Sequence, residues 1–251
     1  MEISEELLRK IYTKNYFHGE EYLDYLSDKH AIQKNFTKRV EQLKKQNNIE
    51  ESNINALEIG CAYGFFGETF RNYFKDAAYL GIDIVAEAIT YGKETLGLNL
   101  KLENYLDHLS VEKYTHIFMW DVIEHLHRPD LFIEKIAKEA YINSELYITT
   151  GDVGSMLSKM QKQKWRLIHP PSHLHYFSKK TIGLLLKKYG FEIESIKYKP
   201  VYRSLKQIFY SLFLLNNPDC LICRKIFNII PEKLFFPLNT FDIMHIKAIK
   251  K

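Results

Sequence analysis

The stretch Asn55-Ala56-Leu57-Glu58-Ile59-Gly60-Cys61-Ala62-Tyr63-Gly64-Phe65-Phe66-Gly67 decides the fold. It begins as a short apolar run, which predicts a buried strand. Glycines follow at positions 60, 64 and 67, and Phe66, Phe70 and Phe74 then recur at helical spacing. A strand, a glycine loop and a helix place a ligand at a helix N-terminus, beside the carboxyl end of a parallel sheet. We therefore expect a ligand site here.

Each glycine has an expected task. Gly60 lets the chain turn off the strand, and Gly64 removes a side chain where the backbone approaches a ligand. Gly67 lets the helix pack close to the sheet. The pattern is Glu-x-Gly-x-x-x-Gly-x-x-Gly rather than Gly-x-Gly-x-x-Gly. The glutamate before the first glycine and the wide loop disfavour a nicotinamide cofactor.

Three further segments follow in order. A second apolar run that ends in an acid is Ala77-Ala78-Tyr79-Leu80-Gly81-Ile82-Asp83. An acid at this position can accept hydrogen bonds from both hydroxyls of a ribose. Tyr114-Thr115-His116-Ile117-Phe118-Met119-Trp120-Asp121-Val122-Ile123-Glu124-His125-Leu126 is another strand with a polar end. Pro170-Pro171-Ser172-His173-Leu174-His175-Tyr176-Phe177-Ser178 precedes a helical pattern that ends at Gly190-Phe191.

These four segments, in this order, resemble the class I S-adenosylmethionine-dependent methyltransferases. The resemblance is to the branch with Glu-His-Leu after the fourth strand and a later His-Leu-x-Tyr-Phe-Ser segment. It runs from about Tyr12 to Lys250 and is strongest from Asn55 to Tyr198. It implies an α/β fold with a Rossmann-like, doubly wound sheet of seven strands, the last of them antiparallel. It also implies S-adenosylmethionine as cofactor, with S-adenosylhomocysteine as product.

The pattern along the chain agrees with this fold class. Strands are expected near 56–60, 78–83, 99–102, 115–120, 145–149 and 191–198, with helices between them. Pro129 should open one helix, and Ser178 should cap another that Gly190 ends. The final run, 241–250, alternates strictly and predicts a last strand at the sheet edge with one solvated face. The resemblance places that strand antiparallel, next to the sixth.

Two regions lie outside the minimal fold. Residues 1–51 predict an N-terminal helical cap, and residues 52–251 form the methyltransferase domain with a helical insertion at 200–240. Aromatic residues of the cap, Tyr12, Tyr16 and Phe17, either touch substrate as a lid or pack on the sheet. The insertion predicts two short amphipathic helices. It packs on the domain, or else covers substrate or meets a membrane or a second subunit.

Composition narrows the class of protein. The chain has 251 residues, 46% of them hydrophobic, which suits one sizeable core. Its net charge of +4 is dispersed, so we expect no nucleic-acid partner. The N-terminus is polar and the chain has no long apolar run, so we expect no transmembrane segment. We also expect a cytoplasmic protein that is a monomer or a homodimer. The three cysteines suggest a reducing compartment, and Cys220 and Cys223 are expected to be incidental buried thiols.

The resemblance assigns the cofactor contacts by position. Backbone groups of the glycine loop, with a polar group near Glu58, hold the methionine tail. Asp83 holds the ribose, Ile84 packs on the adenine, and Asn104 meets the adenine edge. Residues at the end of the fourth strand lie under the methionine portion. The expected cofactor-binding set is Glu58, Gly60, Cys61, Ala62, Tyr63, Gly64, Asp83, Ile84, Asn104, Trp120, Asp121 and Val122.

Methyl transfer to a hydroxyl needs alignment and removal of a proton. Histidine suits that task at neutral pH, and His125, His173 and His175 are the candidates. Each has a structural alternative, as a brace for its loop or turn. His169-x-x-x-His173-x-His175 has a metal-like spacing, but zinc would add cysteine or carboxylate, so no metal is expected. Acceptor contacts are assigned to Tyr16, Trp165, Arg166 and Tyr176.

The sequence therefore predicts an S-adenosylmethionine-dependent methyltransferase that acts on a small molecule. O-methylation of a sugar, a glycan precursor or a related metabolite is the preferred reaction. The apolar insertion keeps open a quinone or lipid acceptor, with peripheral membrane contact through residues 200–240. A catalytically silent cofactor-binding partner subunit is the third alternative.

Overall fold

The structure is a computed structural model that describes residues 25–26, 28–46, 50–214, 217, 219–231 and 234–251. Most of the expected N-terminal cap, including Tyr12, Tyr16 and Phe17, lies outside these residues. The expectations for those three aromatic side chains therefore stay predictions.

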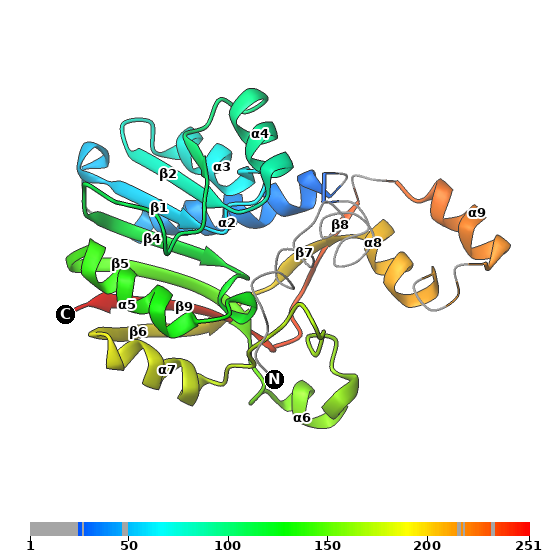
Figure 1. Cartoon of the computed structure of the whole chain (residues 1–251). Coiled ribbons are helices and arrows are strands. Elements are labelled where there is room, and N and C mark those ends of the chain that lie inside the picture. The colour runs from blue at the N-terminus through cyan, green and yellow to red at the C-terminus, as the bar shows by residue number, and fades with distance from the viewer. Residues whose placement is uncertain (1–24, 27, 47–49, 215–216, 218, 232–233) are drawn as a thin grey trace.

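A seven-stranded sheet in the order β3-β2-β1-β4-β5-β9-β6 forms the centre of the molecule (Figure 1). All neighbours run parallel except β9, which is antiparallel to both β5 and β6. The predicted doubly wound fold with its antiparallel last strand is confirmed. The strands are β1 Asn55–Ile59, β2 Ala78–Asp83, β3 Leu100–Leu102, β4 Tyr114–Trp120, β5 Ala140–Gly151, β6 Phe191–Tyr198 and β9 Ile243–Lys250.

The position of β9 corrects one expectation. It lies inside the sheet, between β5 and β6, and not at the edge. The polar residues that alternate along β9 include one that is ion-paired to the neighbouring strands. Lys247 binds Glu145 of β5 and Glu194 of β6, with Nζ to carboxylate distances of 2.6 and 2.9 Å. An ion-paired residue of an inner strand leaves the same sequence pattern as a solvated residue of an edge strand.

Helices cover both faces of the sheet (Figure 1). Helices α2 (Lys29–Gln46), α3 (Phe65–Tyr73) and α4 (Ala86–Glu94) pack on one face around Phe66, Phe70 and Phe118. Helices α5 (Pro129–Glu139) and α7 (Lys179–Lys188) pack on the other. The predicted boundaries of α5 and α7 hold. Pro129 lies in the first turn of α5, Ser178 forms a capping box with Thr181, and Gly190 follows α7 with φ of 78°.

Short helices complete the connections. They are η2 (Glu51–Asn53), η3 (Ile123–His125), α6 (Met156–Gln161) and η4 (Lys162–Lys164). Helix η3 follows β4 directly, so it holds Glu124 and His125 at the carboxyl edge of the sheet.

The insertion contains more than the two expected helices. Strands β7 (Val201–Ser204) and β8 (Phe235–Leu238) pair antiparallel, and they frame α8 (Leu205–Phe209), the π-helical turn η5 (Tyr210–Leu214) and α9 (Leu221–Ile229). The base packs on the domain, since the backbone of Tyr202 in β7 exchanges two hydrogen bonds with the Asn35 side chain of α2. Helix α9 stands away from the sheet and buries no residue (Figure 1). The simple expectation that the insertion packs on the domain therefore holds only for its base.

The cysteine pair also differs from expectation. Cys220 and Cys223 are bonded to each other as a disulfide, and neither is buried. Cys220 caps α9, and the first helical turn brings the two Cα atoms to 5.2 Å. The expectation of incidental buried thiols is wrong for this pair, whereas Cys61 is a buried free thiol.

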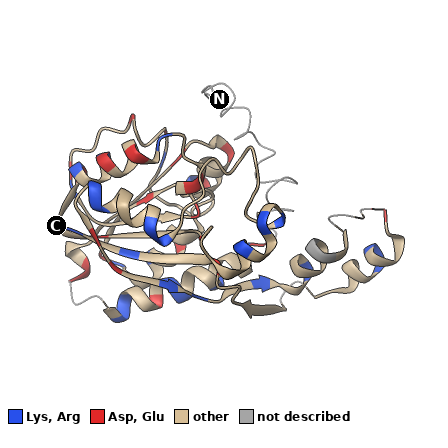
Figure 2. Cartoon of the chain, turned by 90° about the horizontal axis from the view of Figure 1, so that it is seen from below, with Lys and Arg blue, Asp and Glu red and all other residues tan. Residues whose placement is uncertain are grey.

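Surface charge is mixed. Figure 2 shows lysine and arginine on helices and strands in many parts of the chain, with acidic residues among them. Across the described residues, no helix combines the length and the apolarity that a bilayer crossing requires.

Candidate functional site

The glycine loop turns sharply at the carboxyl end of β1. Gly60 has φ of 73°, and its N–H donates to the Ile82 carbonyl of β2 at 2.8 Å. A Cβ at this position would lie 2.5 Å from Cγ2 of Val122. The turn therefore requires glycine for its conformation and for the space that Val122 occupies.

The other two glycines shape the start of α3. Gly64 is the N-cap residue, with φ of 79°, and a Cβ there would lie 2.7 Å from the Leu98 side chain. At Gly67 a Cβ would meet the Tyr79 ring at 2.5 Å, which confirms that this glycine lets the helix approach the sheet. The N-terminal amides of α3 are thereby held at the carboxyl edge.

Asp83 ties the end of β2 to the glycine loop. Its Oδ2 accepts the Ala62 N–H at 2.8 Å, and its Oδ1 accepts the Val85 N–H at 3.0 Å. Burial raises the pKa of this carboxyl above its ordinary value. Each carboxylate oxygen has a second lone pair, which a ribose hydroxyl can use. Ile84 follows with half of its side chain exposed, as an adenine platform would be.

Several residues of the predicted set point into the protein. Glu58 is buried and accepts a hydrogen bond from the Tyr79 hydroxyl, and burial holds its pKa well above the usual range. The Tyr63 ring stacks on Phe65 within the core. Cys61 is buried too, so Cys61 and Tyr63 offer a ligand only main-chain atoms.

The next two strands end in exposed polar residues. Asn104 after β3 is exposed, and its Oδ1 accepts the Leu106 N–H at 3.1 Å. Asp121 after β4 is exposed, with φ of 55°, and its N–H donates to the Thr149 hydroxyl at 2.9 Å. Trp120 differs, because its indole lies on the face covered by α2, with its ring centroid 5.3 Å from that of Phe66.

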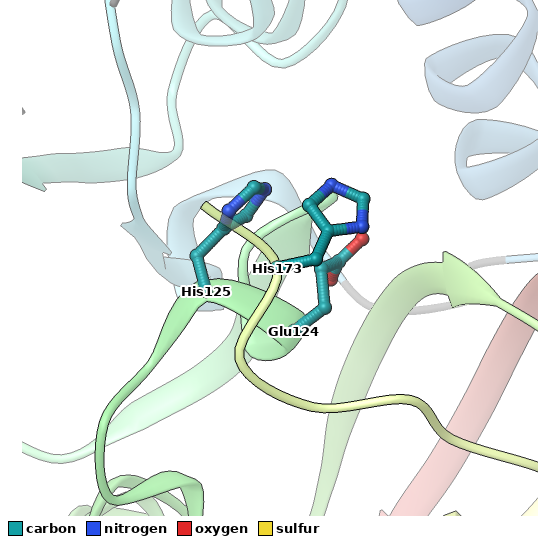
Figure 3. A group of neighbouring side chains, drawn as sticks. All are labelled: Glu124, His125 and His173. Carbon is teal, nitrogen blue, oxygen red and sulfur yellow. The ribbon is translucent and has the colours of Figure 1, made fainter. Parts of the chain in front are cut away.

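Glu124, His125 and His173 come together beside Asp121, from two segments far apart in the sequence (Figure 3). One potential ligand atom from each lies within 4.8 Å of the others, and the two imidazole centroids are 4.6 Å apart. Main-chain bonds join the segments, because the Glu124 carbonyl accepts the N–H groups of Leu174 and His175. Figure 3 shows the Glu124 carboxylate directed toward the His173 ring.

The backbone sets the tautomer of both rings. His125 Nδ1 lies 2.9 Å from the Ser172 carbonyl, and His173 Nδ1 lies 2.8 Å from the Leu167 carbonyl. A carbonyl can only accept, so each Nδ1 carries the hydrogen and each Nε2 carries the lone pair. Both rings are oriented to take a proton, or a cation, at Nε2.

Glu124 has an unusual environment. Its side chain is 6% exposed, and within the described chain Oε2 has no hydrogen-bond partner. Burial, followed by the nearby charge of Asp121, raises the pKa of Glu124 to about 8, while the charge of His173 acts in the opposite direction. Such a carboxyl shares a proton readily with a neighbouring imidazole, and the same donor set would suit a divalent cation.

The other predicted catalytic and acceptor residues are more scattered. His175 Nε2 lies 3.4 Å from the His127 carbonyl, and Tyr176 is 38% exposed. Trp165 is 2% exposed and donates to Asp242 Oδ2 at 2.8 Å. Arg166 donates to Oδ1 of the same carboxylate at 2.9 Å. Trp165 and Arg166 are thus fastened to Asp242, which the sequence did not single out.

Two residues that matter here escaped prediction. Asp242 lies 77 positions from Trp165, and no local pattern links them. Glu124 stands inside the quoted Glu-His-Leu motif, but only its neighbour received a role. The signal for Glu124 was its place directly after β4, at the edge where ligands bind.

The carboxyl edge suits a nucleoside with an amino-acid tail. The first amides of α3 have no acceptor within their own helix, and Asp83 and Ile84 supply a polar and an apolar contact. Fold and site together define a Rossmann-like methyltransferase. A family model described as a methyltransferase domain matches residues 28–196, more than half of the chain. The chain belongs to this family, as its motifs predicted.

Solved structures share the fold at low sequence identity. Magnesium protoporphyrin IX methyltransferase from Synechocystis PCC 6803, with bound SAH, has a TM-score of 0.61 at 13% identity and covers 99% of this chain and 100% of its own. A SAM-dependent methyltransferase from Archaeoglobus fulgidus has a TM-score of 0.58 at 17% identity and covers 90% and 99%. A possible histamine N-methyltransferase from Thermotoga maritima has a TM-score of 0.55 at 14% identity and covers 90% and 92%. No curated protein sequence matches.

Proposed function

We propose that this protein methylates a small molecule with S-adenosylmethionine, and that the acceptor is a hydroxyl of a sugar, a glycan precursor or a related metabolite. The observation that supports this is the buried group of Glu124, His125 and His173 beside the carboxyl edge. A hydroxyl must lose a proton when it is methylated, and this group offers two oriented imidazoles for that proton.

The cofactor would lie along the carboxyl ends of β1, β2 and β4, and its sulfonium supplies an electrophilic methyl group. The amides at the start of α3 bind the carboxylate of its methionine tail. Asp83 binds the ribose hydroxyls, and Ile84 covers the adenine. Asp121 and Val122 lie beneath the methionine portion.

His173 is the preferred base. Its Nε2 takes the proton of the acceptor hydroxyl, and the neighbouring Glu124, once ionised above its pKa of about 8, stabilises the imidazolium that forms. His125 orients the group, since its ring packs edge-on against His173 and its Nδ1 donates to Ser172 of the same loop. His175 lies outside this buried group and comes third.

Asparagine variants test the base. With the true acceptor, His173→Asn should lower turnover by roughly a hundredfold or more, the usual scale for a lost general base. Affinity for S-adenosylmethionine, measured by calorimetry, should stay nearly unchanged, because the base contacts the acceptor only. His30→Asn, on the exposed side of α2, is the matched control. Near-parental turnover in both His173→Asn and His125→Asn would exclude base catalysis by these residues.

The same assay separates a base from a metal centre. Turnover should survive exhaustive dialysis against EDTA, because the base mechanism needs no cation. Loss of activity that returns with a divalent metal would assign the group as a metal centre. Calorimetry also shows whether the cofactor site binds at all, since a partner subunit that has lost cofactor binding gives no heat with S-adenosylmethionine.

A second candidate, a quinone or lipid acceptor, is favoured by the exposed apolar side chains of α9. Leu221, Ile222 and Ile229 are each 73–79% exposed, and Arg224 and Lys225 lie among them. An amphipathic helix of this kind binds at an anionic membrane surface. The protein should then co-sediment with anionic liposomes in low salt.

Matched substitutions make the liposome test specific. Ile222→Glu should abolish sedimentation, whereas Val111→Glu, at a 99% exposed position away from the insertion, should not. A protein that stays wholly in the supernatant removes the lipid alternative.

A further inference from the structure

A concave site lies on the face of the sheet beside α2, away from the cofactor edge. It is a cavity of about 480 Å³ with walls from α2, β4, β5, β6, β9 and the residue after β6. Of the residues predicted for cofactor, catalysis or acceptor, only Trp120 lines it. We call it the basic cavity, and the residues that carry the argument are Arg39, Gln42, Trp120, Lys197, Lys199 and His245.

The charge of the basic cavity is one-sided. Its walls include one carboxylate, Glu194, which is bonded to Lys247, and Glu145 neutralises the same lysine from the neighbouring strand. Two lysines remain, Lys197 from β6 and Lys199 just beyond it, and the Arg39 guanidinium of α2 lies over the Trp120 ring, 4.6 Å from its centroid. Neither lysine forms an ion pair with any residue that the structure describes. Lys199 Nζ instead donates to the neutral amide oxygen of Gln42.

Two buried nitrogen atoms of these walls have unmet hydrogen-bonding capacity. Nε1 of Trp120 and Nε2 of His245 have no hydrogen-bond partner among the described residues. An indole N–H can only donate, so it requires an acceptor. His245 is 8% exposed, and burial, then Arg39 and Lys199, lower its pKa to about 2. It is therefore neutral, and one of its two ring nitrogens carries a hydrogen to donate.

We propose that the basic cavity binds a phosphorylated small molecule. Two lysines without an ion pair among the described residues and two buried ring nitrogens line one volume with a single carboxylate, and a phosphate group brings several acceptor oxygens and negative charge. The volume is many times that of a single water and falls in the usual range for small-molecule sites. Leu43 of α2 and the Tyr147 ring of β5 add apolar wall for a carbon skeleton. This site is separate from the cofactor edge and does not depend on methyl transfer.

Calorimetry on the full chain tests the proposal, with inorganic pyrophosphate as the probe and citrate as the carboxylate comparison. Pyrophosphate should bind saturably, and Lys199→Met should weaken it at least tenfold. Lys138→Met is the control, because Lys138 lies on the exposed side of α5 and pairs with Glu134. Equal binding by both variants, or no saturable binding of pyrophosphate, overturns the proposal. If citrate binds and pyrophosphate does not, the phosphate proposal is wrong and the cavity is a site for a carboxylate ligand.

Proton linkage gives a second readout that a structural role of Lys199 would not move. Burial, then Arg39 and Lys197, lower the pKa of Lys199 to about 8. The other charged or titratable groups of the cavity wall are Tyr147 of β5, Glu194 of β6 and His245 and Lys247 of β9. A bound phosphate favours the charged lysine, so binding at pH 8 should take up protons. Titrations in buffers of different ionisation enthalpy should show this uptake in the parent and not in Lys199→Met. Binding without uptake in the parent would remove Lys199 from the phosphate contact.

Discussion

The glycine-loop edge and the basic cavity lie on one sheet, but their polar groups are in different states. At the edge, Asp83 already accepts two main-chain N–H groups, and the turn at Gly60 is held by the carbonyl of Ile82. In the cavity, Lys197 and Lys199 lie near other cations, and the Trp120 N–H lacks a partner among the described residues. The polar groups of the glycine-loop edge are hydrogen-bonded without a ligand. In the cavity the nearby positive charges repel one another, and a bound anion would reduce that repulsion.

This difference separates the expected effects of mutation. A preformed site is rigid, so a substitution there damages the loop and the binding of the cofactor together. A site that holds unmatched charge is destabilising without ligand, and its mutation can raise stability while it lowers affinity. The two regions should therefore respond to substitution with opposite signs in the free energy of unfolding.

The largest effect is expected at Gly60. In Gly60→Val the new Cβ would meet Val122 at 2.5 Å, in a backbone conformation that branched side chains avoid. Binding of S-adenosylmethionine should fall below detection by calorimetry, and thermal stability should fall as well. Gly183→Ala is the control, because a Cβ there meets only Ile193 at 3.6 Å, and helix propensity then predicts a small gain in stability.

A double variant separates space from conformation at the same turn. Gly60→Ala with Val122→Ala removes the steric contact and leaves the positive φ. Partial recovery of thermal stability relative to Gly60→Ala alone would show that Val122 sets part of the requirement. A Gly60→Ala protein as stable as the Gly183→Ala protein would contradict our account of the turn.

A smaller effect is expected at Asp83. Asp83→Ala should weaken S-adenosylmethionine by about 1–3 kcal/mol, because ribose hydroxyls lose a charged acceptor and the Ala62 amide loses its partner. Calorimetric dissociation constants give the value directly. Asp107→Ala, at an exposed position in the loop after β3, should leave affinity unchanged. Parental affinity in Asp83→Ala would remove the ribose assignment.

Sequence reasoning succeeded where structure is local. The strand before Gly60, the acid that ends β2 and the cap at Ser178 all follow from residues within a few positions of one another. The family match to residues 28–196 confirms the class that these motifs indicated. Local signals were sufficient because each glycine or capping residue acts on its own turn.

The failures share a physical cause, which is pairing between distant segments. The pattern of β9 predicted an edge strand, because nothing nearby shows that Lys247 meets Glu145 and Glu194. Strands β7 and β8 are four residues each and become strands only by pairing across the insertion. The basic cavity needs α2, β4, β6 and β9 in place before its charges meet. Trp120 was assigned to the cofactor from its position at the end of β4, and the direction of its indole, toward α2, could not be read from the sequence.

The smallest effect, and the one that tests the comparison most directly, is expected at Lys199. Its pKa is about 8 in the folded protein, against an ordinary value of 10.5. Between these values the unfolded chain binds a proton that the folded chain does not, so stability from this group rises with pH from 8 to 10.5. Below pH 8 the folded state bears the full cost of the buried charge.

Lys199→Met should therefore be more stable than the parent at pH 7, by about 1 kcal/mol after allowance for partial exposure and the lost bond to Gln42. Urea unfolding at pH 7 and pH 9.5 should show the advantage shrink as the parent lysine loses its proton. Lys138→Met should change stability by less than about 0.5 kcal/mol at either pH. Saturating pyrophosphate should cancel the advantage, because it stabilises the parent more than the weaker-binding variant. A Lys199→Met protein that is less stable than the parent at pH 7 would show that the cavity is satisfied without an anion, like the cofactor edge.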